Sequence, residues 1–224
     1  MKHSRLFSLS LMVLVSTILF GTQSISAQTK TLKFGDDGKF KIVQFTDVHW
    51  RYGDTKSEEA AERMAEVLDA EKPDLVIFTG DVVTAKPAKD GLKAALTPVI
   101  ERKLPFAVTF GNHDDENDLT RAELLAVLRG FEGNLTSSTA NITGVSNYIL
   151  PINGSNSDNA ASVLYIFDSN SYSPLKDVKG YGWIERDQID WYMKSSKAFT
   201  TANGGQPLPS LAFFHIPIPE YHEA

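Results

Sequence analysis

Three short polar motifs in this chain carry side chains that can bind metal ions or move protons. They are Asp47-Val48-His49, Gly80-Asp81 and Gly111-Asn112-His113-Asp114, and each follows an apolar run of residues. Another apolar run ends at His215. Imidazole nitrogens and carboxylate or amide oxygens are ligands for divalent metals. Because the chain has no cysteine, a metal would have to be held by His, Asp, Glu or Asn.

The spacing inside these motifs has a physical reason. Asp47 and His49 are two residues apart, so in an extended segment both side chains project from one face and could coordinate one metal ion together. Gly111 permits a sharp backbone turn, and Asn112 offers a neutral oxygen ligand. Taken singly, the Asp-x-His motif is equally well explained by an Asp that caps a turn beside a half-buried His, and the Gly-Asp motif is better explained as a turn with a capping carboxylate. Four polar strand ends together favour a metal site.

The segments before these motifs predict strands that alternate with helices. Strand-like runs cover residues 40–45, 75–78 and 106–110, and helical patterns cover 57–71 and 92–102. Ser57 is expected to cap the first helix, which ends at Lys72-Pro73. Thr120 and Glu123 predict a capping box for a third helix. The order is βαβαβ, followed by that helix.

The second half of the chain has a different pattern. Strand-like segments at 147–150 and 163–167 flank a Gly/Ser/Asn loop and predict a hairpin, and a helix at 185–199 and a strand at 211–215 follow. The pattern fits an α/β domain with two sheets or one mixed sheet. Ligands of open α/β folds collect beyond the carboxyl ends of the strands, so we expect the polar motifs to meet there.

Composition limits the classes of protein that this chain can be. It has 224 residues, 42% of them apolar, which is enough to fill a core. The absence of cysteine excludes disulfide frameworks, iron–sulfur clusters and a cysteine nucleophile. With a formal charge of −6 the chain has no positive electrostatic field that would attract polyanions, so no nucleic-acid partner is expected. Nothing in the sequence indicates an oligomeric state.

The first 27 residues are typical of an export signal. Lys2 and Arg5 precede an apolar run from Leu6 to Phe20, and small residues follow up to Ala27. The run is shorter than the roughly 20 residues that span a bilayer, so cleavage is favoured over a stable membrane anchor. We therefore expect residues 28–224 to form the mature domain, exported to a periplasm or secreted.

The order of the motifs resembles the calcineurin-like metallophosphoesterase family. The match runs from Asp47 to His215, and the chain is most similar to the purple acid phosphatase-like branch. Segments that carry this second likeness are Tyr181-Gly182-Trp183-Ile184, residues 187–191 and residues 213–221. The resemblance implies an αββα sandwich of two mixed sheets.

The resemblance also implies roles for individual residues. Asp47 and His49 would hold a first metal ion, Asp81 would bridge two ions, and Asn112 and His215 would hold the second. His113 would act at the phosphate, with Asp114 setting its orientation. The two ions would be divalent or trivalent Fe, Mn or Zn, and a hydroxide between them would hydrolyse a small phosphorylated substrate, with phosphomonoesters favoured.

Two departures from the family pattern stand out. Purple acid phosphatases carry a Tyr three residues after the bridging Asp, where this chain has Thr84, so tyrosinate colour is not expected. The family also closes its site with a GHxH segment, and this chain reaches Ala224 without one. The chain is therefore expected to be C-terminally truncated, with an unpaired sheet edge. Phosphodiester or nucleotide hydrolysis, and a non-catalytic exported binding protein with an incomplete metal site, stay open as alternatives.

Overall fold

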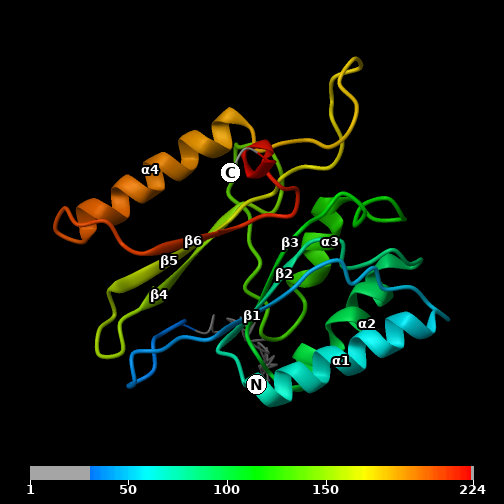
Figure 1. The fold of residues 1–224 in the computed structure, drawn as a ribbon, viewed down its shortest axis with the longest axis horizontal. Coiled ribbons are helices and arrows are strands. Elements are labelled where there is room, and N and C mark those ends of the chain that lie inside the picture. Colours follow the sequence, from blue (N-terminus) through cyan, green and yellow to red (C-terminus); the bar gives the residue numbers. More distant parts are fainter. Residues whose placement is uncertain (1–30, 223–224) are drawn as a thin grey trace, which may run out of the picture.

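Two three-stranded sheets pack against each other in this computed structural model, which describes residues 31–222 (Figure 1). The proposed export signal at residues 1–27 lies outside the described residues. Helices α1 to α3 cover one outer face of the pair of sheets, and α4 covers the other. The layers are therefore those of the expected αββα sandwich.

The first sheet contains the βαβαβ unit. Its strands are β1 (Ile42–Phe45), β2 (Leu75–Thr79) and β3 (Phe106–Thr109), in that order and all parallel. The helices on its outer face are α1 (Thr55–Glu71), α2 (Ala88–Glu101) and α3 (Arg121–Leu128). The expectation of two mixed sheets is thus wrong for this one, whose described strands are joined by helical crossovers and run in the same direction.

The second sheet is the mixed one. Its strands are β4 (Tyr148–Asn153), β5 (Ala160–Ile166) and β6 (Ser210–Phe213). The β4–β5 pair is the expected antiparallel hairpin, and α4 (Arg186–Ala202) carries the chain from β5 to a parallel β6. A 3₁₀ turn, η1 (Pro219–His222), follows. Among the described residues the outer strands are β1 and β3 in the first sheet and β4 and β6 in the second, and Leu211 of β6 is exposed.

Side-chain alternation along β2 divides the core into two layers. Leu75 and Ile77 face the second sheet, whereas Val76 and Phe78 face the helices of the first. All four are fully buried. A strand covered on both faces needs apolar residues at every position, and this explains the unbroken Leu-Val-Ile-Phe run.

Helix capping follows the sequence in one case and departs from it in another. Thr120 and Glu123 form the expected capping box at α3. At α1 the expectation of a Ser57 cap is wrong, because the Asp54 side chain accepts the hydrogen bond from the N–H of Lys56. Ser57 is buried instead and accepts from the N–H of Arg51.

Within residues 31–222 the structure contains no helix with the length and apolarity that a membrane span requires.

Buried hydrogen bonds join the two sheets. The hydroxyl of Thr109 donates to the carbonyl oxygen of Phe167 at 2.6 Å and lies 3.0 Å from the hydroxyl of Ser146. The phenol of Tyr148 donates to the carbonyl oxygen of Val108 at 2.8 Å. These bonds place the carboxyl end of β3 beside that of β5.

Thr109→Val should therefore lower the free energy of unfolding by about 1–3 kcal/mol. The replacement keeps the side-chain shape but leaves buried polar partners without their bond. Urea unfolding would measure the change, with Thr201→Val on the exposed end of α4 as the control. An unfolding midpoint equal to that of the control would show that this hydrogen bond does not hold the sheets together.

Candidate metal centre

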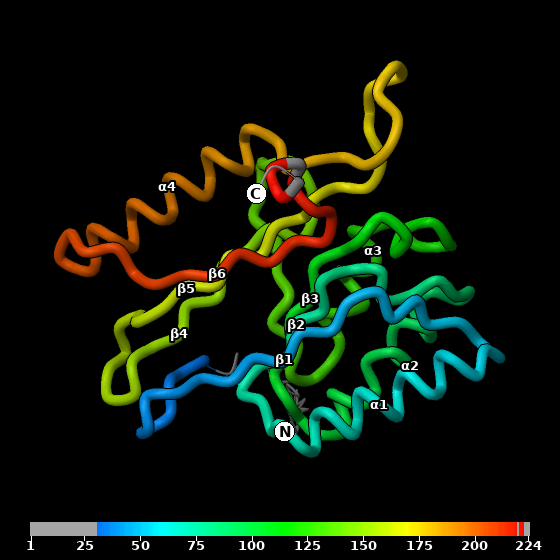
Figure 2. Tube along the Cα trace, viewed as in Figure 1, coloured from blue at the N-terminus to red at the C-terminus, as the bar shows by residue number. Residues whose placement is uncertain are grey.

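The polar motifs meet at one end of the sandwich. Asp47 and His49 follow β1, Asp81 follows β2, Asn112 follows β3 and His215 follows β6. All four strands run in the same direction toward this end (Figure 2). Residues far apart in the sequence therefore form one cluster, as expected for the carboxyl edge of parallel strands.

A compact set of ligand atoms surrounds the carboxylate of Asp81. Ligand atoms of Asp47, His49 and Asp81 all lie within 4.8 Å of one another. His49 Nε2 is 3.4 Å from Asp81 Oδ2 and 3.6 Å from Asp47 Oδ1. On the other side, His215 Nε2 is 3.3 Å from the same Asp81 Oδ2. One carboxylate oxygen thus faces two imidazoles.

The backbone at three of these residues is left-handed. The φ angles are 55° at Asp47, 47° at His49 and 52° at Asp81, a region that residues with a side chain seldom adopt. Hydrogen bonds from the N–H of Asp47 to the Gly80 carbonyl and from the N–H of His49 to the Asp81 carbonyl hold this conformation. Such strain persists where the surrounding structure enforces it, and it is concentrated at functional sites.

Two glycines allow the strand ends to approach one another. A Cβ atom at Gly80 would lie 2.6 Å from the backbone nitrogen of Gly111 and 2.7 Å from His215 Nδ1. A Cβ atom at Gly111 would overlap the Asp81 carboxylate. The glycines of the Gly-Asp and Gly-Asn-His-Asp motifs are thus required by close contact around Asp81.

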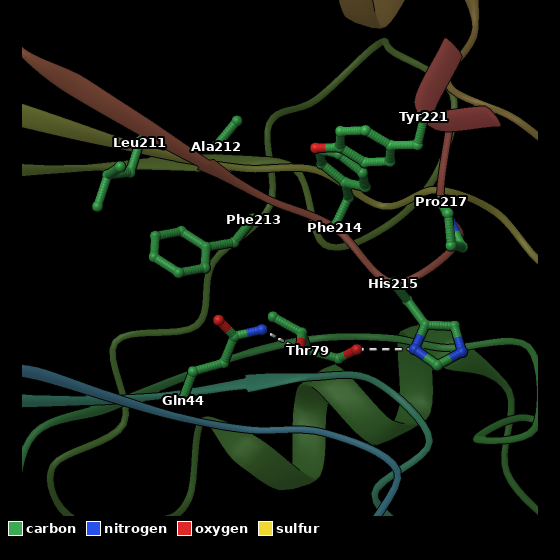
Figure 3. A pocket seen from close by; sticks show the side chains of 9 residues that line it. All are labelled: Gln44, Thr79, Leu211, Ala212, Phe213, Phe214, His215, Pro217 and Tyr221. Atoms are coloured by element: carbon green, nitrogen blue, oxygen red, sulfur yellow. Dashed lines mark hydrogen bonds between the residues drawn. The ribbon is translucent and has the colours of Figure 1, made fainter. Parts of the chain in front are cut away.

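His215 is held so that one ring nitrogen faces the cluster. Its Nδ1 lies 2.7 Å from the carbonyl oxygen of Thr79, which fixes Nδ1 as the donor and leaves Nε2 toward Asp81 (Figure 3). Burial alone would lower the pKa of His215, but the Asp81 carboxylate and the Thr79 carbonyl raise it. A second hydrogen bond of this kind commonly orients a metal-binding histidine. An open groove of 490 Å³ along β6 also borders this residue.

Asp81 is arranged to remain ionised. Burial alone would raise the pKa of its carboxyl, but hydrogen bonds from His215 and from the backbone N–H of His113 lower it below the usual value. The N–H of His113 is 2.8 Å from Oδ1, so Oδ2 is the oxygen left for the imidazoles. An ionised carboxylate at the centre of the cluster is what two cations would share.

Asp114 does not orient the His113 imidazole, and that expectation is wrong. Its two carboxylate oxygens accept hydrogen bonds from the N–H groups of four residues: Asp81, Val82, Val83 and Gly111. The side chain is 1% exposed. Burial raises the pKa of Asp114 to about 6, although hydrogen bonds from the N–H groups of Gly111, Val83 and Val82 act in the opposite direction. Asp114 therefore ties the loop after β2 to the loop after β3.

Glu116 takes the place beside His113 that Asp114 was expected to fill. His113 Nδ1 lies 2.7 Å from Glu116 Oε2, and this hydrogen bond raises the pKa of His113. The ring centroids of His113 and His49 are 5.3 Å apart, so the His113 ring borders the cluster. Hydrogen bonds from His113 and Tyr172 lower the pKa of Glu116 and keep it ionised.

Asn112 is buried and reaches Tyr172. Its side-chain Nδ2 donates to the phenol oxygen of Tyr172 at 3.2 Å, so the amide oxygen Oδ1 is the atom left for a ligand role. Glu116 and Tyr172 were both missed from the sequence. The sequence does contain a signal that could have found Tyr172. The apolar run that ends at Phe167 is followed by the polar residues Asp168-Ser169-Asn170, which mark a further strand end close to Tyr172.

Arg121 of α3 supports the loop that carries Asn112 and His113. Its guanidinium donates to the carbonyl oxygen of Gly111 at 2.7 Å and to the buried carboxylate of Asp168 at 2.5 Å. Asp168 also accepts from backbone N–H groups of the loop before β4. The loop after β3 is thus bonded to both sheets.

Thr84 stands where purple acid phosphatases carry a tyrosine. Its hydroxyl donates to the carbonyl oxygen of His49 at 3.2 Å and accepts from Arg51 Nε at 3.0 Å. Thr84 therefore stabilises the segment that carries His49 and supplies no phenolate.

The donor set fits divalent metal ions. Carboxylate oxygens and imidazole nitrogens converge within ligand distance, and the nitrogen of His215 that faces the cluster is the free one. The chain has no cysteine, so the set contains no soft thiolate ligand.

Comparison with known proteins identifies the family of the chain. Residues 40–223 match the model of the calcineurin-like phosphoesterases, a range that holds every residue of the cluster. The chain belongs to this family. Membership of this family implies that the protein binds divalent metal ions, and this agrees with the cluster of Asp and His side chains. The fold agrees too, since a dimetal phosphatase from Danio rerio superimposes with a TM-score of 0.57 at 13% identity, over 80% of this chain and 70% of that one.

Curated relatives include enzymes and proteins described as inactive. Phosphatase DCR2 of Saccharomyces cerevisiae is 38% identical over 90% of this chain and 38% of its own length. Probable inactive purple acid phosphatase 29 of Arabidopsis thaliana is 34% identical over 88% of this chain and 59% of its own. The chain thus spans between about two fifths and three fifths of the length of these family relatives.

Replacing Asp114 should disrupt the cluster through its backbone. Asp114→Asn keeps the size of the side chain but turns an NH₂ group toward backbone donors, so we expect a loss of about 2–4 kcal/mol in unfolding free energy, since each unsatisfied buried group costs about 1–3 kcal/mol. Urea unfolding of this variant beside Asp36→Asn, an exposed control, measures it. Equal stability of the two variants would contradict the anchoring role.

Proposed function

We propose that this protein hydrolyses phosphate esters in a metal-dependent reaction, with small phosphomonoesters as its substrates. The observation that carries the proposal is the position of Asp81 Oδ2, 3.4 Å from His49 Nε2 and 3.3 Å from His215 Nε2. An ionised carboxylate between two imidazoles is suited to sharing its oxygens between two cations. Bound ions would polarise the phosphoryl oxygens and activate water as the nucleophile.

The proposed ligands divide into two sets that share Asp81. Asp47 and His49 would complete the first, and Asn112 and His215 the second. The geometry supports this division because His49 and His215 approach the same oxygen of Asp81. Fe, Mn and Zn all accept such ligands.

His113 is the residue proposed to act on the substrate. Glu116 occupies its Nδ1, so Nε2 is the nitrogen available to the phosphate. A protonated Nε2 would hydrogen-bond a phosphoryl oxygen as charge develops there, or donate its proton to the leaving group. A pKa raised by Glu116 increases the protonated fraction near neutral pH.

A non-catalytic role is the second candidate. It is favoured by the Arabidopsis relative whose name describes it as probably inactive. In that case the cluster would bind a metal ion or a phosphorylated ligand without turnover. Phosphodiester hydrolysis would use the same cluster, and a diester substrate distinguishes it from monoester hydrolysis.

Hydrolysis of 4-nitrophenyl phosphate by the metal-stripped protein, titrated with Mn²⁺, Zn²⁺ or Fe²⁺, tests the function. We expect turnover to return with metal and to fall to background in Asp81→Asn, because the shared ligand is weakened. Asp36→Asn should keep wild-type turnover. Full activity of Asp81→Asn would refute the bridging role, and metal binding without turnover in the wild type would favour the non-catalytic role.

His113→Ala should separate chemistry from metal binding. The loss of a general acid typically lowers a rate by about 10²- to 10⁴-fold. We expect a fall of this order in kcat for 4-nitrophenyl phosphate, with Zn²⁺ affinity close to that of the wild type. An unchanged kcat would remove His113 from the reaction.

We also propose that the protein is exported after removal of residues 1–27. The basic start, the apolar run and the small residues before Gln28 support it. N-terminal sequencing of the protein recovered from the periplasm or medium should begin at Gln28. Recovery of the chain only from the cytosol, with Met1 retained, would contradict export.

A further inference from the structure

We propose that Glu116 and Tyr172 form a clamp that sets the orientation of two neighbouring side chains, Asn112 and His113. The clamp would turn the amide oxygen of Asn112 toward the second metal ion and the Nε2 atom of His113 toward the substrate. This inference rests on the roles given to Asn112 and His113 in the proposed function.

The contacts form an unbroken chain from one side chain to the other. Asn112 Nδ2 is 3.2 Å from the phenol oxygen of Tyr172, and that phenol is 2.7 Å from Glu116 Oε1. The other oxygen, Oε2, is 2.7 Å from His113 Nδ1. One carboxylate therefore contacts both the phenol and the imidazole.

The chemistry of the groups fixes the direction of each bond. An ionised carboxylate only accepts, so the Tyr172 hydroxyl must donate to Oε1, and its oxygen is then free to accept from Asn112. The NH₂ of Asn112 points at Tyr172, and Oδ1 points away from it. In the same way His113 must carry a proton on Nδ1, which leaves Nε2 as the nitrogen that Glu116 does not occupy.

Both residues of the clamp are themselves held in place. Glu116 lies one turn beyond His113, and its N–H donates to the His113 carbonyl oxygen. Tyr172 starts the projecting loop between β5 and α4, which Figure 1 shows extending from the body of the molecule. The hydroxyl of the preceding Ser171 donates to the carbonyl oxygen of Asn112 at 3.1 Å, which ties the base of this loop to the same strand end.

Tyr181 provides a matched control for Tyr172. Their rings stack with centroids 6.2 Å apart, and both are half exposed, at 54% and 48%. Among the described residues the Tyr181 hydroxyl has no side-chain hydrogen bond, whereas that of Tyr172 has two. Removing either hydroxyl keeps the aromatic pair, and only one removal breaks the clamp.

Zinc binding tests the clamp without any reaction. We expect Tyr172→Phe to weaken the binding of the second Zn²⁺ ion by about tenfold, within the range of about 10- to 100-fold typical of residues that orient a ligand. Tyr181→Phe should bind Zn²⁺ like the wild type. Competition with a chelating dye measures both affinities. Equal Zn²⁺ affinity in the two variants would overturn the proposed orientation of Asn112.

The protonated nitrogen of His113 gives a second readout, by ¹⁵N NMR of the Zn²⁺-loaded protein at a pH where the imidazole is neutral. We expect the wild type to carry the proton on Nδ1, Glu116→Ala to shift toward a mixture, and Glu116→Gln to lie between them because its amide retains one acceptor. Glu132→Ala, an exposed replacement, should match the wild type. A wild-type proton on Nε2, or no change in Glu116→Ala, would overturn the clamp.

The dependence of rate on the leaving group links the clamp to catalysis. Glu116→Ala should lower kcat more for phenyl phosphate than for 4-nitrophenyl phosphate, because the poorer leaving group depends more on a proton from His113. If the wild type hydrolyses neither ester, the proposed function fails, and Zn²⁺ affinity and the NMR tautomer still decide the clamp.

Discussion

Four backbone N–H groups directed at one buried carboxylate are the interaction on which the cluster depends. Asp114 accepts from Asp81, Val82, Val83 and Gly111, and so joins the loops that follow β2 and β3. A carboxylate with several donors is one of the few ways to bury a negative charge in a protein. The left-handed backbone at Asp81 and the contact between Gly80 and Gly111 follow from this convergence.

The second sheet contributes to the cluster through hydrogen bonds rather than through the core alone. Thr109 and Tyr148 join β3 to strands of the other sheet, and Arg121 links the loop after β3 to Asp168 at the end of β5. His215 enters at the end of β6 and is oriented by Thr79 of β2. The packing of the two sheets thus decides which imidazole reaches the far side of Asp81.

Membership of the calcineurin-like phosphoesterases and the geometry of the cluster point to the same chemistry. The chain spans only part of the length of its curated relatives, and three of them are described as probably inactive. The cluster in residues 31–222 nevertheless brings together a carboxylate, two imidazoles that face it and a third imidazole at its edge. Glu116 and Tyr172 extend it toward the projecting loop between β5 and α4, the region best placed to differ among relatives.

The sequence by itself determined the strand and helix order, the capping box of α3 and the identity of the candidate ligands. It did so because apolar periodicity and turn residues act locally, and because polar residues at strand ends collect at one edge of a parallel sheet. Only the tertiary structure decided which hydrogen-bond donors each carboxylate accepts from. Asp114 and Glu116 lie near His113 in the sequence, and burial against backbone donors directed one inward while the other remained beside the imidazole. Tyr172 entered the cluster across a long sequence separation, which no local pattern encodes, since its contacts depend on how the two sheets pack.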